Sequence, residues 1–580
     1  MKAFNKTTIM MMICFFIGHS AFADVKPETI NGETFSSDIS EDISGPQTGV
    51  LASGNIYQVV GDTWVSKYDT LIIEPGVTIK FMDYYSFNIK GLLIASGIET
   101  DSIVFTSGQA SSNPCDWCEI YFEGSSNDNS IISYARIEYA NRGIYCFSSS
   151  PTISNNTISF NGNDWDLSGI YCSSSSPTII HNTINNNSIG IYCVFSSSPS
   201  ISDNTISNNT WSGIYSKDSS IPTISDNIIS NNHSGIYCID SSPIIKDNTI
   251  INNEGYAIDC TSNSSPSISD NTIDNNREAI SCNRSSPNID NNIISNTYGC
   301  GVRCDNYSSP TISNNTIFNL GVDGVYCFAH CFPSISNNTI SNCYHGIYCS
   351  WYSSPTINKN TIINSRHRGI YCSYDCTPFI VNNILYDNYI GIEALAIPSS
   401  LEYNLFWEND TLFLGDSVPA AFGEITTVNA NDDPCDTYYN LFMDPLFVDT
   451  SNFDYHLTED SPCINAGNPD PVYYDPDGTI ADIGAFYFST TGISDKTMNN
   501  NISVYPNPSD GIFNISIEGV NEKVQVKVFD IHGNNHRSFE MNGTRNLTTK
   551  QLDLKELAAG IYFISFSGKN FSDVRKIVIQ

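Results

Sequence analysis

The middle of the chain repeats one short pattern of apolar and polar positions. From Pro151 to Pro378, prolines recur every 21 to 26 residues, and an asparagine follows each proline after five positions. Every repeat holds two or three runs in which apolar and polar residues alternate, separated by glycine, proline, asparagine and serine. A repeat this short has no room for paired helices but suits one coil of a parallel β-helix with three strands. The pattern therefore predicts an all-β solenoid.

Each column of the repeat has an expected place. Ile153, Ile179, Ile201 and their equivalents should point inward as an aliphatic core. The asparagine column should lie in a turn, where the amide bridges to the next coil and tolerates a left-handed backbone. A third column should form a buried ladder of thiols, because serine and alanine replace cysteine there. It comprises Cys146, Cys172, Cys193, Ser216, Cys238, Cys260, Cys282, Cys304, Cys327, Cys349, Cys372 and Ala394.

A tyrosine column alternates with the cysteines and is therefore expected to face outward. Its tyrosines are Tyr145, Tyr171, Tyr192, Tyr215, Tyr237, Tyr326, Tyr348 and Tyr371. Flat rings with a hydroxyl edge suit sugar rings and protein contacts, so this column is a candidate ligand-binding stripe. The alternative is that stacked tyrosines only stabilise the face of a sheet.

Three consecutive coils interrupt the tyrosine column with Asp259, Ser281 and Arg303, and Glu278 is nearby in sequence. A carboxylate can act as a base and a cation can neutralise a uronate, so Asp259, Arg303 and Glu278 are candidate catalytic residues. The alternative is ordinary variation among repeats, since Asp259 and Arg303 should lie two coils, or about 9.6 Å, apart. A second candidate cluster joins His345 to Arg366-His367-Arg368 one coil later.

The two ends of the chain differ from the repeats. Lys2 and Lys6, the apolar run 9–17 and the triplet Ala21-Phe22-Ala23 predict a secretory signal peptide over residues 1–23. A leader is expected over 24–50, and no later segment is long and apolar enough to span a membrane. After residue 488 the sequence indicates a polar linker over 489–500 and a strand-rich module over 501–580.

The charge balance excludes one class of partner. The chain has 580 residues and a formal net charge of -35, with 40 % hydrophobic residues. Nucleic-acid binding depends on clustered lysine and arginine, so no nucleic-acid partner is expected. The hydrophobic content is sufficient for a core, which excludes global disorder.

The remaining cysteines and one aspartate cluster suggest covalent or metal links. Cys115 and Cys118 are three residues apart, and Cys300, Cys327 and Cys372 are each followed four residues later by another cysteine. In an exported chain these pairs favour local disulfides over zinc or redox chemistry. Asp475, Asp477 and Asp482 surround Gly478 and resemble part of a calcium loop. No cofactor is required, and Ca²⁺ is the candidate ion; a plain surface turn is the alternative.

Two resemblances add to these expectations. The Pro-x-Ile-x-x-Asn-x-Ile and Gly-Ile-Tyr columns, with Leu71 to Ile79, resemble the right-handed parallel β-helix, pectate-lyase-like superfamily. This implies opening coils over 51–145, regular coils over 146–400 and a closing segment over 401–488. Tyr505-Pro506-Asn507-Pro508 and the run from Leu557 to Tyr562 resemble the type A sorting domain of the type IX secretion system of Bacteroidetes. That resemblance implies a small C-terminal β-sandwich handled by the secretion machinery.

The function expected from the sequence is an exported surface or secreted protein without catalytic activity, which adheres to polysaccharide or matrix. The alternative is a polysaccharide lyase or glycoside hydrolase that works on the same face of the β-helix. Near-uniform repeats favour the first, because an active site on such a face usually needs long irregular insertions. The chain is expected to pass through the periplasm to its destination.

Overall fold

The computed structural model describes residues 40–488 apart from 125, 416 and 417, and residues 501–579 apart from 506–510, 519–522, 531–534, 543–547, 559 and 568–571. The expected signal peptide, the first part of the leader and the linker over 489–500 lie outside the described residues. The chain divides into two units, Met1–Ser267 and Ile268–Gln580.

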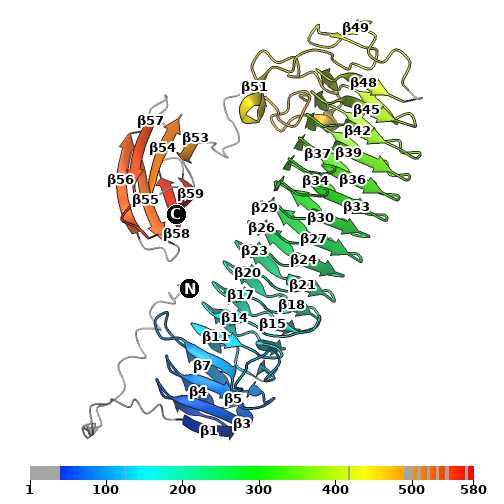
Figure 1. The fold of residues 1–580 in the computed structure, drawn as a ribbon. Coiled ribbons are helices and arrows are strands. Elements are labelled where there is room, and N and C mark those ends of the chain that lie inside the picture. The colour runs from blue at the N-terminus through cyan, green and yellow to red at the C-terminus, as the bar shows by residue number, and fades with distance from the viewer. Residues whose placement is uncertain are drawn as a thin grey trace, which may run out of the picture. The chain divides into compact units, whose positions relative to one another are not determined.

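In the first unit, short parallel strands stack coil upon coil (Figure 1). One coil consists of β13 (Thr152–Ser154), β14 (Thr157–Ser159) and β15 (Ser168–Ser173). These strands pair with β16 (Thr178–Ile180), β17 (Thr183–Asn185) and β18 (Ile189–Val194) of the following coil. The pairing keeps equivalent columns in register, so that Tyr171 lies opposite Tyr192 and Cys172 opposite Cys193.

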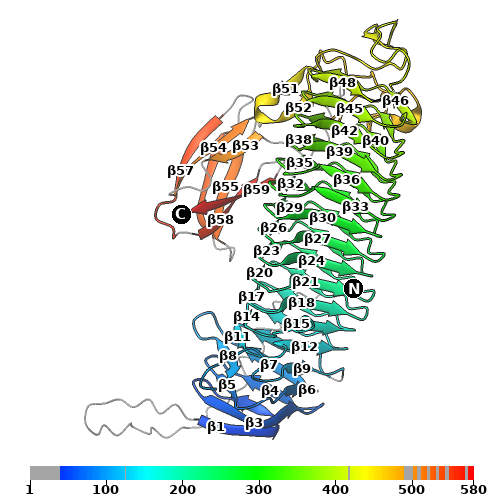
Figure 2. The ribbon, with the colours of Figure 1, turned by 45° about the vertical axis from the view of Figure 1, so that its right-hand side comes forward.

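The second unit repeats the arrangement, and Figure 2 shows its strands from another side. One of its coils consists of β34 (Thr311–Ser313), β35 (Thr316–Phe318) and β36 (Val325–Phe328). They pair in parallel with β37 (Ser334–Ser336), β38 (Thr339–Ser341) and β39 (His345–Ser350). The predicted all-β parallel solenoid is confirmed.

The third strand of each coil carries the tyrosine column and the residues beside it. In the first unit these strands are β12 (Ile144–Phe147), β15, β18, β21 (Ser212–Lys217), β24 (Ser234–Ile239) and β27 (Tyr256–Thr261). In the second unit they are β30 (Glu278–Asn283), β33 (Val302–Asp305), β36, β39, β42 (Arg368–Cys372) and β45 (Ile390–Ala394).

The predicted core columns are confirmed. Ile153, Ile179 and Ile201 are fully buried, and so is every member of the cysteine column. Alternation along each strand explains this result, because isoleucine and cysteine two positions apart share the inner face.

The asparagine column forms a hydrogen-bonded ladder between coils. Asn227 Oδ1 accepts the backbone N–H and the Nδ2–H of Asn204, both at 3.0 Å. Asn204 Nδ2 also donates to the carbonyl oxygens of Ile179 and Ser202, at 3.0 and 2.9 Å. The left-handed residue is the one before each asparagine, such as Asp203 with φ 56°, so the expectation of left-handed backbone at the asparagine itself is wrong.

The expected local disulfides are wrong, because the eighteen described cysteines are all free. Two cysteines that are four residues apart in the sequence lie in different columns of the repeat. Cys327 faces the core, whereas Cys331 takes the place of a serine in the next turn, where its Sγ donates to the carbonyl oxygen of Phe328 at 3.1 Å. Neighbouring coils have Ser308 and Ser353 at the same position, and Ser308 Oγ donates to the carbonyl oxygen of Asp305.

The solenoid begins before residue 51, because β1 (Ser40–Pro46) pairs in parallel with β3 (Ile56–Val65). In the second unit, the expected closing segment contains β46 (Ser400–Glu402), β47 (Leu405–Trp407) and β48 (Thr411–Leu414). It continues with two short antiparallel pairs, β49 (Thr427–Val428) with β50 (Pro434–Cys435) and β51 (Phe447–Asp449) with β52 (Asp454–Leu457). Leu441, Leu457, Cys463 and Ile483 of this later part form one buried cluster with Leu405.

The C-terminal module contains two antiparallel sheets. One consists of β53 (Asn501–Tyr505), β54 (Ile512–Glu518) and β57 (Thr548–Asp553). The other consists of β56 (Asn535–Asn542), β55 (Lys523–Asp530), β58 (Gly560–Ser567) and β59 (Ser572–Ile579). Buried residues of both sheets, among them Phe513, Val526 and Ile564, belong to one cluster. Within the described part of the chain, no helix has the length and hydropathy needed to cross a bilayer.

Candidate functional site

The tyrosine column lies on the outer face of the third strands, in register within each unit. In the first unit the ring centroids of successive tyrosines from Tyr145 to Tyr237 are 4.7 to 5.1 Å apart. In the second unit Tyr348 is 5.2 Å from Tyr326 and 4.8 Å from Tyr371. Each ring therefore rests on its neighbours, which is the cross-strand stacking that stabilises a sheet face.

The expectation that the whole column is exposed is wrong at Tyr192. This side chain is only 1 % exposed, and it forms a small apolar cluster with Ile189 and Val194. The other seven tyrosines are half-buried. Burial is also the main reason why the pKa of Tyr171, Tyr215 and Tyr326 rises to about 12. Their hydroxyls are therefore neutral hydrogen-bonding groups at physiological pH.

Of the three candidate catalytic residues, Arg303 and Glu278 belong to the second unit, where the charge of each favours the charged form of the other. Asp259 belongs to the first unit, where it lies opposite Tyr237. Arg303 belongs to the second unit, where its Nε lies 2.6 Å from an Asp305 carboxylate oxygen and its guanidinium carbon 5.2 Å from the Tyr326 ring centroid. Glu278 accepts the backbone N–H of Cys300 at 2.8 Å, and burial raises the pKa of its carboxyl. Arg303 is thus already neutralised by a protein carboxylate.

Four polar side chains form a row in the second unit: Asp323, His345 and Arg368 lie where third strands begin, and Glu393 lies opposite Tyr371 within β45. Asp323 Oδ1 is 2.7 Å from His345 Nδ1, and His345 Nε2 is 3.2 Å from Arg368 Nη1. Arg368 Nε in turn donates to Glu393 at 2.5 Å. Arginine has only donors, so His345 Nε2 must accept and its Nδ1–H donates to Asp323. Asp323 thus orients the imidazole ring of His345 so that Nε2 faces Arg368.

Part of this row of polar side chains could be predicted from the sequence. His345 and Arg368 were expected to form a cluster, and His367 adds to it with its ring centroid 5.5 Å from that of His345. Burial, followed by the charge of Arg368, lowers the pKa of His367. Asp323 was missed, although it stands directly before Gly324, as His345 stands before Gly346 and Arg368 before Gly369. The position before the glycine column is the signal that could have found it.

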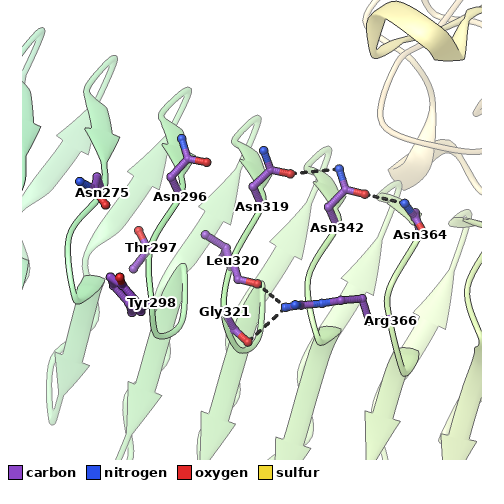
Figure 3. A pocket seen from close by; sticks show the side chains of 10 residues that line it. All are labelled: Asn275, Asn296, Thr297, Tyr298, Asn319, Leu320, Gly321, Asn342, Asn364 and Arg366. Atoms are coloured by element: carbon purple, nitrogen blue, oxygen red, sulfur yellow. Dashed lines mark hydrogen bonds between the residues drawn. The ribbon is translucent and has the colours of Figure 1, made fainter.

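A groove of about 600 Å³ lies over the turns that lead into these strands (Figure 3). It follows from a second asparagine column, five residues after the first, which the sequence analysis did not recognise. In the first unit Asn161, Asn187, Asn209, Asn232 and Asn253 form an unbroken ladder through their amides. In the second unit four consecutive positions of this column, between Asn276 and Asn388, hold Thr297, Leu320, Cys343 and Ser365. Thr297 and Leu320 line the groove where amides would otherwise stand.

Outer asparagines form one wall of the groove. Asn296, Asn319 and Asn342 occupy left-handed positions with φ between 50° and 57°. Asn342 Nδ2 donates to Asn319 Oδ1 at 3.2 Å, and Asn364 Nδ2 donates to Asn342 Oδ1 at 2.6 Å (Figure 3). Asn319 Nδ2, at the end of this row, has no protein partner among the described residues.

Arg366 lies across the floor of the groove. Its Nη2 donates to the carbonyl oxygens of Leu320 and Gly321, at 2.5 and 3.1 Å (Figure 3). Gly321 keeps this floor open, because a Cβ there would come within 2.1 Å of the carbonyl oxygen of Tyr298. Arg366 is exposed, and within the described part of the chain no carboxylate forms an ion pair with it. Two carbonyl oxygens orient the guanidinium but leave its charge uncompensated.

The aspartates expected to bind calcium have other partners. Asp475 accepts a hydrogen bond from Lys359 Nζ at 2.5 Å. Asp482 accepts the backbone N–H groups of Asn465 and Phe488, and burial raises its pKa to about 6. Asp477 accepts from Thr479. The described residues contain no group of three or more histidine, cysteine, aspartate or glutamate side chains that could hold a metal ion.

Comparison with known families identifies both parts of the chain. The model of the right-handed β-helix region matches residues 118–277 and 278–422, and that of a pectate-lyase-like β-helix domain matches residues 44–144. The model of a secretion system C-terminal sorting domain matches residues 503–580. The chain therefore carries an export signal of the type IX system, is handled by that machinery, and is located at the cell surface or secreted.

Curated protein sequences contain no significant match to the chain. Among solved structures, the periplasmic alginate epimerase AlgG is 14 % identical over 63 % of this chain and 76 % of its own, with a TM-score of 0.22. Pectate lyase Pel9A is 14 % identical over 72 % of this chain and 89 % of its own, with a TM-score of 0.24. The A-module of mannuronan C-5 epimerase AlgE4 from Azotobacter vinelandii is 13 % identical over 60 % and 89 %, with a TM-score of 0.26. At these values the likeness identifies neither a ligand nor a reaction.

Proposed function

The chain belongs to the right-handed β-helix family, and we propose that it is a non-catalytic surface or secreted protein that binds acidic polysaccharide with its second unit. One observation carries the proposal. A groove of about 600 Å³ has an exposed, uncompensated guanidinium on its floor and a row of amides along its wall. Such a site suits a hydroxyl-rich polymer that bears anionic groups.

Arg366 supplies the charge recognition. A guanidinium presents a planar fork of donors that matches a carboxylate or sulfate, and charge-assisted hydrogen bonds are roughly twice as strong as neutral ones. Only Nη2 is engaged by carbonyl oxygens, which leaves Nη1 and Nε for an external anion. The net charge of -35 does not prevent this contact, because at physiological ionic strength charges beyond about 8 Å are largely screened.

The surroundings of Arg366 favour a sugar polymer over a small anion. Asn296, Asn319 and Asn342 present one amide per coil, at the spacing of successive strands. Asn319 Nδ2 is available to a hydroxyl of the ligand. Tyr298 stands at the groove with 78 % of its surface exposed, and an open aromatic ring is a stacking surface for a sugar.

The test is the affinity of the full chain for polygalacturonate, dextran sulfate and neutral dextran, measured by affinity electrophoresis. Arg366→Gln should weaken binding of the two acidic polymers at least about tenfold, since hydrogen bonds to charged groups contribute about 1.5–3 kcal/mol. Asn319→Asp should act in the same direction by adding a carboxylate to the wall. It keeps the acceptor for Asn342 Nδ2, and aspartate tolerates a left-handed backbone.

Two matched controls separate the groove from general charge. Asn208→Asp adds the same charge at the same column of the first unit, where the second ladder is intact and φ is 55°. Arg284→Gln removes an exposed cation from a different turn of the second unit. Both should leave binding unchanged. The proposal fails if Arg366→Gln binds the acidic polymers as tightly as the natural chain, or if Arg366→Gln weakens binding of neutral dextran to the same extent.

The Asp323–His345 pair favours a second candidate function, a polysaccharide lyase. His345 Nε2 would take the proton from the carbon beside a uronate carboxylate. The released electron pair forms a carbon–carbon double bond, and the glycosidic oxygen leaves and takes a proton from water. Arg368 would first have to turn from Nε2 to the carboxylate. The check is ultraviolet absorbance of unsaturated uronates, which Asp323→Asn and His345→Ala should abolish.

A further inference from the structure

The second unit also carries exposed aromatic residues on the turn that follows each third strand. Their exposed fractions are 69 % for Tyr307, 51 % for Trp351, 50 % for Tyr352 and 61 % for Tyr374, and His330 is exposed as well. We propose that this aromatic turn ladder, defined by these five residues, binds the flat faces of uncharged sugar rings in a polysaccharide. This second binding site is independent of the groove and of Arg366.

The rings are held at a regular spacing. The centroid of His330 is 5.1 Å from Tyr307 and 5.4 Å from Tyr352, with ring planes within 8° of parallel. Trp351 and Tyr374 form a neighbouring pair with centroids 5.8 Å apart. At these separations parallel rings are offset, so that part of each face stays uncovered. The result is a row of rings on four successive coils, one of which carries two rings, Trp351 and Tyr352.

Backbone hydrogen bonds between the turns fix this row. The N–H of Tyr307 donates to Ala329 at 3.0 Å, that of His330 to Trp351 at 3.0 Å, and that of Tyr352 to Tyr374 at 3.1 Å. The turn backbone is therefore ordered before a ligand arrives, and stacking between neighbouring rings reduces the side-chain freedom that is lost on binding.

The aromatic residues occupy backbone positions that do not suit them. Tyr307, His330, Trp351, Tyr352 and Tyr374 have φ values between 48° and 68°. A left-handed backbone is uncommon for bulky side chains, whereas asparagine and aspartate adopt it readily. The same turn of the first unit largely follows that preference, with Asp218, Ser219, Asp240, Ser262 and Asn263, and Phe195 is a single aromatic exception there. Packing of the core does not explain exposed rings at strained positions, whereas binding does.

The chemistry of the row selects the ligand. Its five side chains are aromatic rings with hydroxyl, indole and imidazole edges, and none of the five is a lysine or arginine; Arg284 lies at the turn of the preceding coil, before the row begins. The faces can cover the C–H side of a pyranose while the edges hydrogen bond to hydroxyl groups. A repeating row of equal rings suits a repeating chain, in which many weak contacts add up.

The experiment measures affinity of the full chain for hydroxyethyl cellulose, galactomannan and polygalacturonate by affinity electrophoresis. Tyr307→Asn combined with Tyr352→Asn should weaken binding of at least one neutral polymer about tenfold and leave polygalacturonate binding unchanged. Asparagine suits the left-handed backbone, so the melting temperature should not fall. Phe195→Asn is the matched control, because Phe195 is 57 % exposed at the same turn of the first unit with φ 54°. It should bind like the natural chain.

Two results would overturn the proposal: no neutral polymer binds the natural chain, or the double variant binds it unchanged. A change of oligomeric mass in the double variant, measured by sedimentation, would instead assign the ladder to self-association and also reject it. Arg366→Gln distinguishes this site from the groove. If only Arg366→Gln loses binding of acidic polymers, the groove binds them. If only the tyrosine variant loses binding of neutral polymers, the aromatic turn ladder binds those.

Discussion

The two units build the same coil but maintain different numbers of asparagine ladders. In the first unit both asparagine columns are continuous, the second from Asn161 to Asn253. In the second unit the first column is continuous from Asn271 to Asn440, whereas the second is interrupted between Thr297 and Ser365. One ladder per coil is thus enough to keep the strands in register.

The coils in which the second asparagine ladder is interrupted are also the coils that carry the polar side chains of the candidate site. The coils that lack the second ladder carry Asp323, His345 and Arg368 at the start of their third strands, and Arg366 in the groove. Where the ladder is intact, the equivalent positions hold Ser234 and Ser212. A repeat protein of this kind varies where hydrogen bonding is redundant, and the columns that hold the fold stay uniform.

The first ladder should be the most sensitive element of the second unit. In Asn338→Ala, the N–H of Asn315 loses the oxygen that accepts it at 2.9 Å, and the carbonyl oxygen of Ile312 loses a donor at 2.9 Å. Each buried group left unsatisfied costs about 1–3 kcal/mol, so the free energy of unfolding should fall by about 4 kcal/mol. Denaturant unfolding measures the loss. A loss below about 1 kcal/mol would contradict the view that this ladder holds the coils.

Much of this architecture could be predicted from the sequence, because each column repeats in every coil. The inward Ile153 and Cys172, the outward Tyr171 and the bridging Asn204 follow from period-two alternation and a turn residue. The second asparagine column was equally periodic in the first unit. It was overlooked because its interruption hides it when all coils are read together.

The candidate site could be predicted only in part, because its partners depend on side-chain reach. The sequence placed His345 and Arg368 in one cluster but could not show that Arg303 is paired with Asp305 within its own strand. Nor could it show that Arg366 extends back over two coils to Leu320. Tyr192 was expected to be exposed like its equivalents, but Ile189 and Val194 beside it in the same strand are apolar and help to cover it.

Restoring the second ladder in the second unit should stabilise it. Ser365→Asn places an amide next to Asn388, whose Oδ1 already accepts the N–H of Ser365 at 2.9 Å. The substitution also removes a serine Oγ that is buried without a hydrogen-bond partner. A net gain of about 1 kcal/mol is expected for the new hydrogen bonds.

The reverse exchange, Asn232→Ser in the first unit, is the control for this prediction and should lower stability. Denaturation midpoints of both variants measure the two effects. If Ser365→Asn were destabilising, asparagine would be absent from the interrupted column because it packs poorly there. The alternative, that a second ladder is simply not needed in these coils, would then be wrong.

The smallest effect should come from Glu278→Gln. Burial raises the pKa of this carboxyl, so the folded chain binds its proton more tightly than the unfolded chain. That contribution is fully present below the unfolded pKa of about 4.3 and is lost as the pH rises through the folded value. Glutamine keeps an oxygen for the N–H of Cys300 but has no charge to desolvate.

The variant should therefore be more stable than the natural chain at pH 7, within about 0.5 kcal/mol, and this advantage should disappear toward pH 4. Unfolding midpoints of both proteins across that range measure the gap. Glu278→Ala is the control, because it removes the acceptor and should be less stable at every pH. Arg303 and Arg277 favour the charged carboxylate, against the cost of burial. A natural chain that is more stable than Glu278→Gln at pH 7 would show that the attraction of Arg303 and Arg277 for the charged carboxylate outweighs the cost of burying it.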